Sequence, residues 1–235
     1  DNERTFRVTS YNGDAREYAY KVVKSEIESD GDVELRTPEE VASFAATKTT
    51  VIKGNLIIGS DAEEAEKITD ISALASLKEI TGNIVIRNSY NGADLTGLDN
   101  IVSVGGLQVG SIDASSKATE LHMISMKALE TLSGDISVYN DQVTFVLFEK
   151  LTTVGGSVMF NAPSLQSFEF PVLATVGKDL NIQGLNEENA AAGSIASLEM
   201  PELTNVGGVL SVNNLAKLTS INFLKLKETG GLDFH

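Results

Sequence analysis

Few residues in this chain of 235 residues have the types and the spacing that chemistry requires. There is no cysteine, and the two histidines, His122 and His235, are too far apart in the repeat described below to predict a shared metal site. The acids Asp135 and Asp179 and the base Arg87 are isolated, whereas acid–base and glycosidase chemistry needs two such groups on one face of adjacent turns. We therefore predict no catalytic residue, no metal site and no cofactor, and a protein that is not an enzyme.

An acidic cluster is the remaining candidate for ion binding. Asp61, Glu63, Glu64 and Glu66 lie within six residues of one another, and carboxylate oxygens are ligands that calcium prefers. The cluster lacks the glycine-spaced loop of a dedicated calcium site. A solvated loop or a short helix is therefore the favoured interpretation.

A short sequence phrase recurs eight times, and the elements that it forms must position any binding surface of the chain. In each copy a glycine, or Lys178 once, is followed by apolar residues two and four positions later. The copies begin at Gly54, Gly82, Gly105, Gly134, Gly156, Lys178, Gly208 and Gly230. A phrase that recurs every 22 to 30 residues predicts a solenoid, in which each turn buries its apolar face against its neighbours.

The period of two within each copy predicts a strand whose alternate side chains point into a core. One inward row is Leu56, Ile84, Leu107, Ile136, Val158, Leu180, Leu210 and Leu232, and the other is Ile58, Ile86, Val109, Val138, Phe160, Ile182, Val212 and Phe234. Apolar residues three apart, as in Leu74-x-x-Leu77-x-x-Ile80, precede the copies and predict a 3₁₀-like or irregular opposite wall.

The pattern divides the chain into three parts. Residues 1–36 form an N-terminal extension, in which alternation predicts two short strands joined by a turn at 12–14. Residues 37–50 contain a capping helix and a lead-in, because Thr37 is a good N-cap, Pro38 suits the first helical position and Glu40 completes a capping box. Residues 51–235 are the repeat solenoid, with projecting loops expected at 60–73, 110–127 and 183–194.

Charge and hydropathy limit the classes of partner. The formal net charge of −15 argues against nucleic-acid binding, which needs clustered lysine and arginine. No apolar run approaches the roughly 18 residues of a membrane span, so we expect no span in these residues. The chain begins at Asp1 rather than methionine, from which we expect that an upstream segment such as a signal peptide was removed.

Two runs carry a family resemblance. Residues 165–182, with Phe168-x-Phe170-Pro171 before Val176-Gly177, and residues 198–212, with Leu198-x-Met200-Pro201 before Val206, look like the receptor L-domain repeat. With the stretch from Thr37 to Leu56, the chain is similar to leucine-rich-repeat surface proteins of gut-type bacteria. This resemblance implies a mainly β, right-handed β-helix of about eight turns, on an exported protein at the cell surface, such as a bacterial lipoprotein, that is non-enzymatic and engaged in adhesion. The flanking cysteines of eukaryotic receptor L domains are absent.

The outward positions of the repeat supply the binding candidates. We predict that Arg87, Gln108, Tyr139, Met159 and Asn181 contact a protein partner, since aromatic and flexible side chains are favoured at interfaces. A carbohydrate is less expected, because the chain has no tryptophan. The alternative is a β-helix protein that binds carbohydrate or degrades polysaccharide. The apolar C-terminal edge, around Phe223, Leu226 and Phe234, further predicts self-association.

Overall fold

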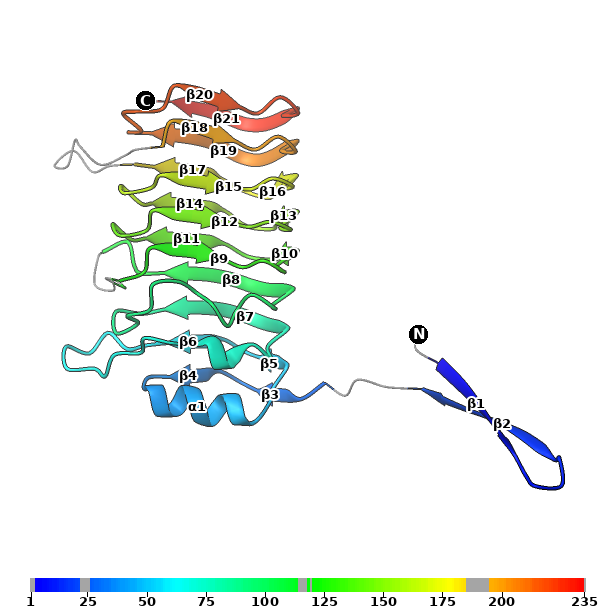
Figure 1. Cartoon of the computed structure of the whole chain (residues 1–235). Helices are drawn as coiled ribbons and strands as arrows, with labels where there is room; N and C mark the ends of the chain where they lie inside the picture. Colours follow the sequence, from blue (N-terminus) through cyan, green and yellow to red (C-terminus); the bar gives the residue numbers. More distant parts are fainter. Residues whose placement is uncertain (1–2, 22–25, 114–117, 119, 185–194, 235) are drawn as a thin grey trace.

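The computed structural model describes residues 3–21, 26–113, 118, 120–184 and 195–234. Figure 1 shows most of the chain as a stack of short parallel strands, which begins beside helix α1 and ends at β20 and β21. The fold is mainly β and resembles a solenoid, as the repeat predicts. Among the described residues, no helix is long and apolar enough to cross a bilayer.

The N-terminal strands form a sheet of their own. β1 (Glu3–Thr9) pairs antiparallel with β2 (Ala15–Lys21), and Gly13 adopts a φ of 92° in the turn between them. The Phe6 ring stacks on the Tyr18 ring at 5.4 Å between centroids, on a face that is half exposed. Alternation in the sequence therefore located both strands and their turn.

The strands of the long sheet lie in two strips, side by side. The first strip contains β3 (Glu28–Asp30), β5 (Val51–Lys53), β10 (Thr131–Leu132), β13 (Thr153–Val154) and β16 (Thr175–Val176). The second contains β4 (Val33–Leu35), β6 (Leu56–Ile58), β11 (Ile136–Tyr139), β14 (Val158–Asn161) and β17 (Leu180–Gln183). Four longer strands run through both strips: β7 (Glu79–Ile86), β8 (Ser103–Val109), β19 (Asn205–Asn213) and β21 (Glu228–Phe234).

The stack begins before the first of the eight predicted copies of the repeated phrase. β3 pairs with β5, and β4 pairs with β6 through Val33↔Leu56 and Leu35↔Ile58. β3 and β4 lie within residues 1–36, which were predicted to form an N-terminal extension. Gly31, followed by Val33 and Leu35, is a further copy of the phrase that this prediction missed, and both apolar side chains are buried.

The two inward rows are confirmed as columns of the sheet. Leu56, Ile84, Leu107 and the residues that follow them in the row are register partners from β6 to β21. Every member up to Leu210 and Val212 is buried. Leu232 and Phe234 keep the register but are 61% and 43% exposed, because no described layer stacks on β21. The expected self-association through this edge stays a prediction.

Backbone contact explains the glycine of the repeated phrase. A Cβ atom on Gly156 would lie 2.5 Å from the carbonyl oxygen of Gly134 in the previous layer. In the layer where Lys178 replaces the marker, the preceding Gly177 approaches the Gly155 carbonyl, at 2.1 Å from an added Cβ. Glycine therefore recurs because successive layers touch through their backbones at this corner.

The opposite wall differs in part from the expectation. From residue 123 onward it is a five-stranded parallel sheet of β9 (Met123–Ser125), β12 (Phe145–Leu147), β15 (Ser167–Glu169), β18 (Ser197–Glu199) and β20 (Ser220–Asn222). The expected 3₁₀ character is found only before these strands, at η1 (Ser72–Leu74), and in the turns, where for example the Leu77 N–H donates to the Leu74 carbonyl at 3.0 Å. The prediction of an irregular wall was therefore wrong for these layers, where inward side chains two residues apart, such as Phe168 and Phe170, favour strands.

Helix α1 (Pro38–Ala46) has the predicted bounds. The Thr37 hydroxyl accepts a bond from the Glu40 N–H at 3.2 Å, while the Glu40 carboxylate accepts from the Arg36 N–H at 2.5 Å, one residue before the position expected for a capping box. Val41 and Ala45 are buried in the common core. In Figure 1 the helix lies at the end of the stack, beside β4.

Candidate functional site

The outward face of the long sheet brings four predicted residues onto neighbouring strands. Gln108 on β8 is the register partner of Ser137 on β11, Ser137 pairs with Met159 on β14, and Met159 pairs with Asn181 on β17. With strands about 4.8 Å apart, this column extends about 14 Å. Tyr139 lies on the same face of β11, two residues after Ser137. These positions are therefore adjacent in space although the sequence separates them by 73 residues.

Tyr139 and Met159 form the most distinctive contact on this face. The Tyr139 hydroxyl lies 2.6 Å from the Met159 sulfur, and both side chains are half-buried. Partial burial raises the pKa of the Tyr139 phenol. The Asn181 Oδ1 atom is buried and has no hydrogen-bond partner among the described residues. This face therefore offers an aromatic–sulfur pair next to an unused acceptor.

Arg87 lies at the edge of this face and already has a partner. Its guanidinium is 3.5 Å from the Asp61 carboxylate, and the other Asp61 oxygen accepts a bond from the Asn88 N–H at 3.1 Å. Asp61 therefore holds the 60–73 loop against the end of β7 rather than an ion. The described residues contain no cluster of three or more His, Asp or Glu side chains that could hold a metal.

The isolated acids on neighbouring positions bond to the backbone of the next layer. The Asp135 Oδ1 accepts from the Ser157 N–H at 2.7 Å, and the Asp179 Oδ1 accepts from the Val209 N–H at 2.8 Å. Asp32 does the same for Asn55 at 2.8 Å, which lowers the pKa of the Asp32 carboxyl. Next to the marker position, these aspartate oxygens take the place of a backbone carbonyl as the acceptor between neighbouring strands. Asp135 and Asp179 therefore have a structural role.

Two further polar residues are structural. The Tyr90 phenol is buried and donates to the carbonyl of Asp94, and burial raises its pKa. Asn140 is buried, donates to the Ala118 carbonyl at 2.9 Å and accepts from the Gln142 N–H at 2.8 Å. Asn140 therefore serves the fold. The proposed loops at 110–127 and 183–194 fall partly outside the described residues.

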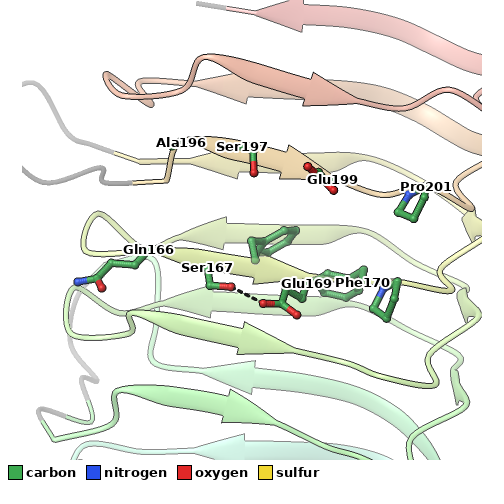
Figure 2. Close-up of a pocket in the computed structure, with 10 residues that line it drawn as sticks. Gln166, Ser167, Glu169, Phe170, Ala196, Ser197, Glu199 and Pro201 are labelled. Carbon is green, nitrogen blue, oxygen red and sulfur yellow. Dashed lines mark hydrogen bonds between the residues drawn. The ribbon is translucent and has the colours of Figure 1, made fainter.

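Sequence reasoning missed a pocket in the opposite wall, between β15 and β18. Its volume is about 430 Å³. Figure 2 shows Ser167 and Glu169 on the lower strand, facing Ser197 and Glu199 on the upper strand, with Phe170 and Pro201 farther along. The Ser167 hydroxyl donates to the Glu169 carboxylate at 2.7 Å. No sequence motif marks this pocket, because the two glutamates are thirty residues apart and meet only through the stacking.

A gap in the hydrogen-bond ladder creates this pocket. At four other junctions of this wall, among the described residues, two successive N–H groups donate to one carbonyl of the previous layer, as the Gln166 and Ser167 N–H groups do to Thr144 at 2.8 and 3.1 Å. The described residues show no such bonds from Ala196 or Ser197 to the Gln166 carbonyl. β15 and β18 are joined through the single register pair Glu169↔Glu199, whereas β12 and β15 share three pairs. The two strands therefore meet at the glutamates and separate toward the serines.

Comparison with known proteins adds a family match. Residues 48–111 match the family model described as Receptor L domain, which confirms the resemblance for the segment that contains β5 to β8. The match suggests a ligand-binding module of receptor type, in a family that is typically extracellular and not enzymatic. It covers less than half of the chain. No curated protein and no solved structure matches the chain.

Proposed function

We propose that the chain is a non-catalytic recognition module that binds a protein partner through the outward face of the long sheet. The observation that carries this proposal is the register of Gln108, Met159 and Asn181, which places two carboxamides and a thioether in one column beside Tyr139. Arg87 extends the surface toward the 60–73 loop. The Receptor L domain match supports a ligand-binding role of this kind.

The chemistry of the face favours a protein partner. Aromatic and methionine side chains are enriched in protein interfaces, and here Tyr139 and Met159 are in contact and half accessible. The buried Asn181 Oδ1 atom is costly to leave unpaired, and a partner could donate to it only after the carboxamide turns outward. Because strands on both sides hold the backbone, the face can bind with little reorganisation.

The placement of Asp135 and Asp179 supports a recognition face without catalysis. A glycosidase or lyase needs carboxylates that are free to exchange protons with a substrate. Asp135 and Asp179 instead accept backbone N–H groups of the next layer. An enzyme at this face would have to disrupt its own stack to use them.

We extend the proposal to the architecture and location that the resemblance implies. The coil is a right-handed β-helix of about eight turns, after the eight copies of the phrase, and α1 caps its first layer. The protein is exported and acts at the cell surface, as a bacterial lipoprotein in adhesion. The match to the Receptor L domain, a family that is typically extracellular, supports this location.

Carbohydrate binding is the second candidate, including by a β-helix that degrades polysaccharide. It is favoured by the carboxamides of Gln108, Asn161 and Asn181 on the same face, since such groups can hydrogen-bond sugar hydroxyls. The face lacks the tryptophan platform that sugar rings commonly stack on, because the chain contains no tryptophan.

The test is a partner screen followed by matched variants. Proteins retained by the immobilised chain from membrane and matrix extracts are purified, and their affinities are measured by interferometry. We expect Tyr139→Ala to weaken the binding at least about tenfold, as truncation of an interface anchor does, and Arg87→Ala to weaken it less. Tyr11→Ala is the control, because Tyr11 is fully exposed in the β1–β2 turn. All three variants should keep the wild-type melting temperature.

The contrary outcome is equally specific. A partner that binds Tyr139→Ala and Tyr11→Ala with equal affinity would move the interface away from the long sheet. Cleavage of a polysaccharide by the purified chain, lost in Asp135→Asn or Asp179→Asn while the melting temperature stays unchanged, would replace the proposal with the enzyme alternative.

A further inference from the structure

We propose that the pocket between β15 and β18 is a binding site for a guanidinium group, presented as an arginine side chain by a peptide or protein. This site lies on the opposite wall from the proposed recognition face and does not depend on that proposal. Three observations carry the inference: the interrupted ladder, the paired glutamates and the size of the pocket.

The interrupted ladder leaves hydrogen-bonding groups at the pocket. Elsewhere in this wall, the carbonyl equivalent to that of Gln166 accepts two N–H groups from the next layer, as the Thr144 and Ala196 carbonyls do. The described residues give the Gln166 carbonyl no such donors, and Gln166, Ala196 and Ser197 all line the pocket. All three residues are exposed, so water pairs these backbone groups in the free protein, and a ligand that hydrogen-bonds here takes the place of that water.

The charge of the pocket selects a cation. Glu169 and Glu199 are direct register partners on adjacent strands, and both are exposed at the pocket. Two carboxylates opposite each other repel. No lysine or arginine among the described residues forms an ion pair with either of them. A bound cation would therefore remove a repulsion as well as form new bonds.

The shape favours a guanidinium over a smaller cation. A volume of about 430 Å³ accommodates a whole side chain with adjoining backbone, whereas a bare ion would leave most of it unfilled. The acceptors belong to two different strands: the Gln166 carbonyl and Glu169 on one side, and Glu199 on the other. A guanidinium presents five N–H donors in a planar fork, which can bond to acceptors on both strands at once, while an ammonium is a point charge.

The experiment uses a minimal probe and its neutral isostere. The ¹⁵N-labelled chain is titrated with Nα-acetyl-L-arginine amide and, separately, with Nα-acetyl-L-citrulline amide, which keeps the shape and loses the charge. We expect saturable shifts of the amides from 166 to 170 and from 196 to 199, with a dissociation constant of about 1 mM for a ligand of this size. Citrulline should bind at least about tenfold more weakly.

Variants test whether the chemical-shift changes arise from binding in the pocket. Glu169→Gln and Glu199→Gln should each weaken arginine binding several-fold, and the double variant should abolish it. Glu149→Gln is the matched control, since Glu149 is exposed in the turn that follows β12. A spectrum that keeps its dispersion shows that each variant is folded. Equal binding of arginine and citrulline, shifts that Glu149→Gln reduces as much as Glu199→Gln, or no saturable shift at about 50 mM probe would overturn the proposal.

Discussion

The two walls of the stack respond differently to the same interruption of the repeat. The sequence between β17 and β18 departs from the repeat at residues 183–194, where the spacing between successive copies is largest, 30 residues from Lys178 to Gly208. In the long sheet the register continues across this layer without a shift, from Leu180↔Leu210 to Gln183↔Asn213. In the short sheet the strands on either side keep one register pair and open a pocket.

The number of anchors in each wall explains the difference. A layer of the long sheet is held by two inward apolar columns and by a glycine corner where an added Cβ on Gly177 would meet the previous backbone at 2.1 Å. β15 and β18 each have one buried residue within their bounds, Phe168 and Leu198, and the next buried residues, Phe170 and Met200, lie just beyond the strand ends. One residue keeps a strand on the core but does not fix its distance to the neighbouring strand. The long sheet therefore suits a rigid recognition face, and the short sheet suits an opening.

The largest expected effect lies in the inward columns of the long sheet. Leu210 is buried, and Leu232 is its partner in the next layer with 61% of its surface exposed. Leu210→Ala should lower the free energy of unfolding by about 2–5 kcal/mol through the cavity it leaves. Leu232→Ala removes the same atoms from an open layer and should cost less than about 1 kcal/mol. Denaturant melts measure both, and equal losses would show that β21 is covered in solution.

This column was predictable from the sequence because two local signals agree in seven of the eight predicted copies. The glycine fixes where the layers touch, and the period of two fixes which residues point inward, so the register follows. The β1–β2 hairpin and α1 were predictable for the same reason, since a turn sequence and a capping sequence lie beside a periodic run. The start of the stack carries the same signal in Gly31, Val33 and Leu35, but this copy was missed because its glycine lies within the turn-like run 29–32.

The pocket and the tasks of the acids depend on contacts between layers, which the sequence does not encode locally. In the sequence Asp179 is an isolated carboxylate. Only the stacking of the layers shows that the Val209 N–H, thirty residues later, donates a hydrogen bond to it. Glu169 and Glu199 likewise become neighbours only through β15 and β18. The site candidates were easier to predict, because Gln108, Met159 and Asn181 occupy one position of the repeat. Their shared face follows from period and register, whereas their binding role stays a prediction.

Hydrogen exchange at three equivalent serines should distinguish the open junction of the short sheet from the other junctions of that sheet. The Ser167 N–H donates to the Thr144 carbonyl at 3.1 Å and the Ser220 N–H donates to the Ala196 carbonyl at 3.2 Å. Among the described residues, no such bond joins the Ser197 N–H to Gln166. We expect the Ser197 amide to exchange at least about tenfold faster than the other two, because an amide without a partner needs no opening step. Equal protection of all three amides would mean that the ladder closes in solution.

The smallest expected effect concerns the one register pair that still joins β15 to β18. Glu169 and Glu199 repel across this pair, so Glu199→Gln removes a like-charge contact and leaves the shape of the side chain. We expect the variant to be more stable than the wild type by about 0.2–1 kcal/mol, with the gain shrinking in high salt because both side chains are exposed. Thermal melts at low and high salt measure the difference, with Glu149→Gln as the control. A loss of stability in Glu199→Gln would mean that the Glu199 carboxylate forms a bond that holds the strands together. That bond would then stabilise the opening in the short sheet. Like-charge repulsion would no longer distinguish the short sheet from the long sheet.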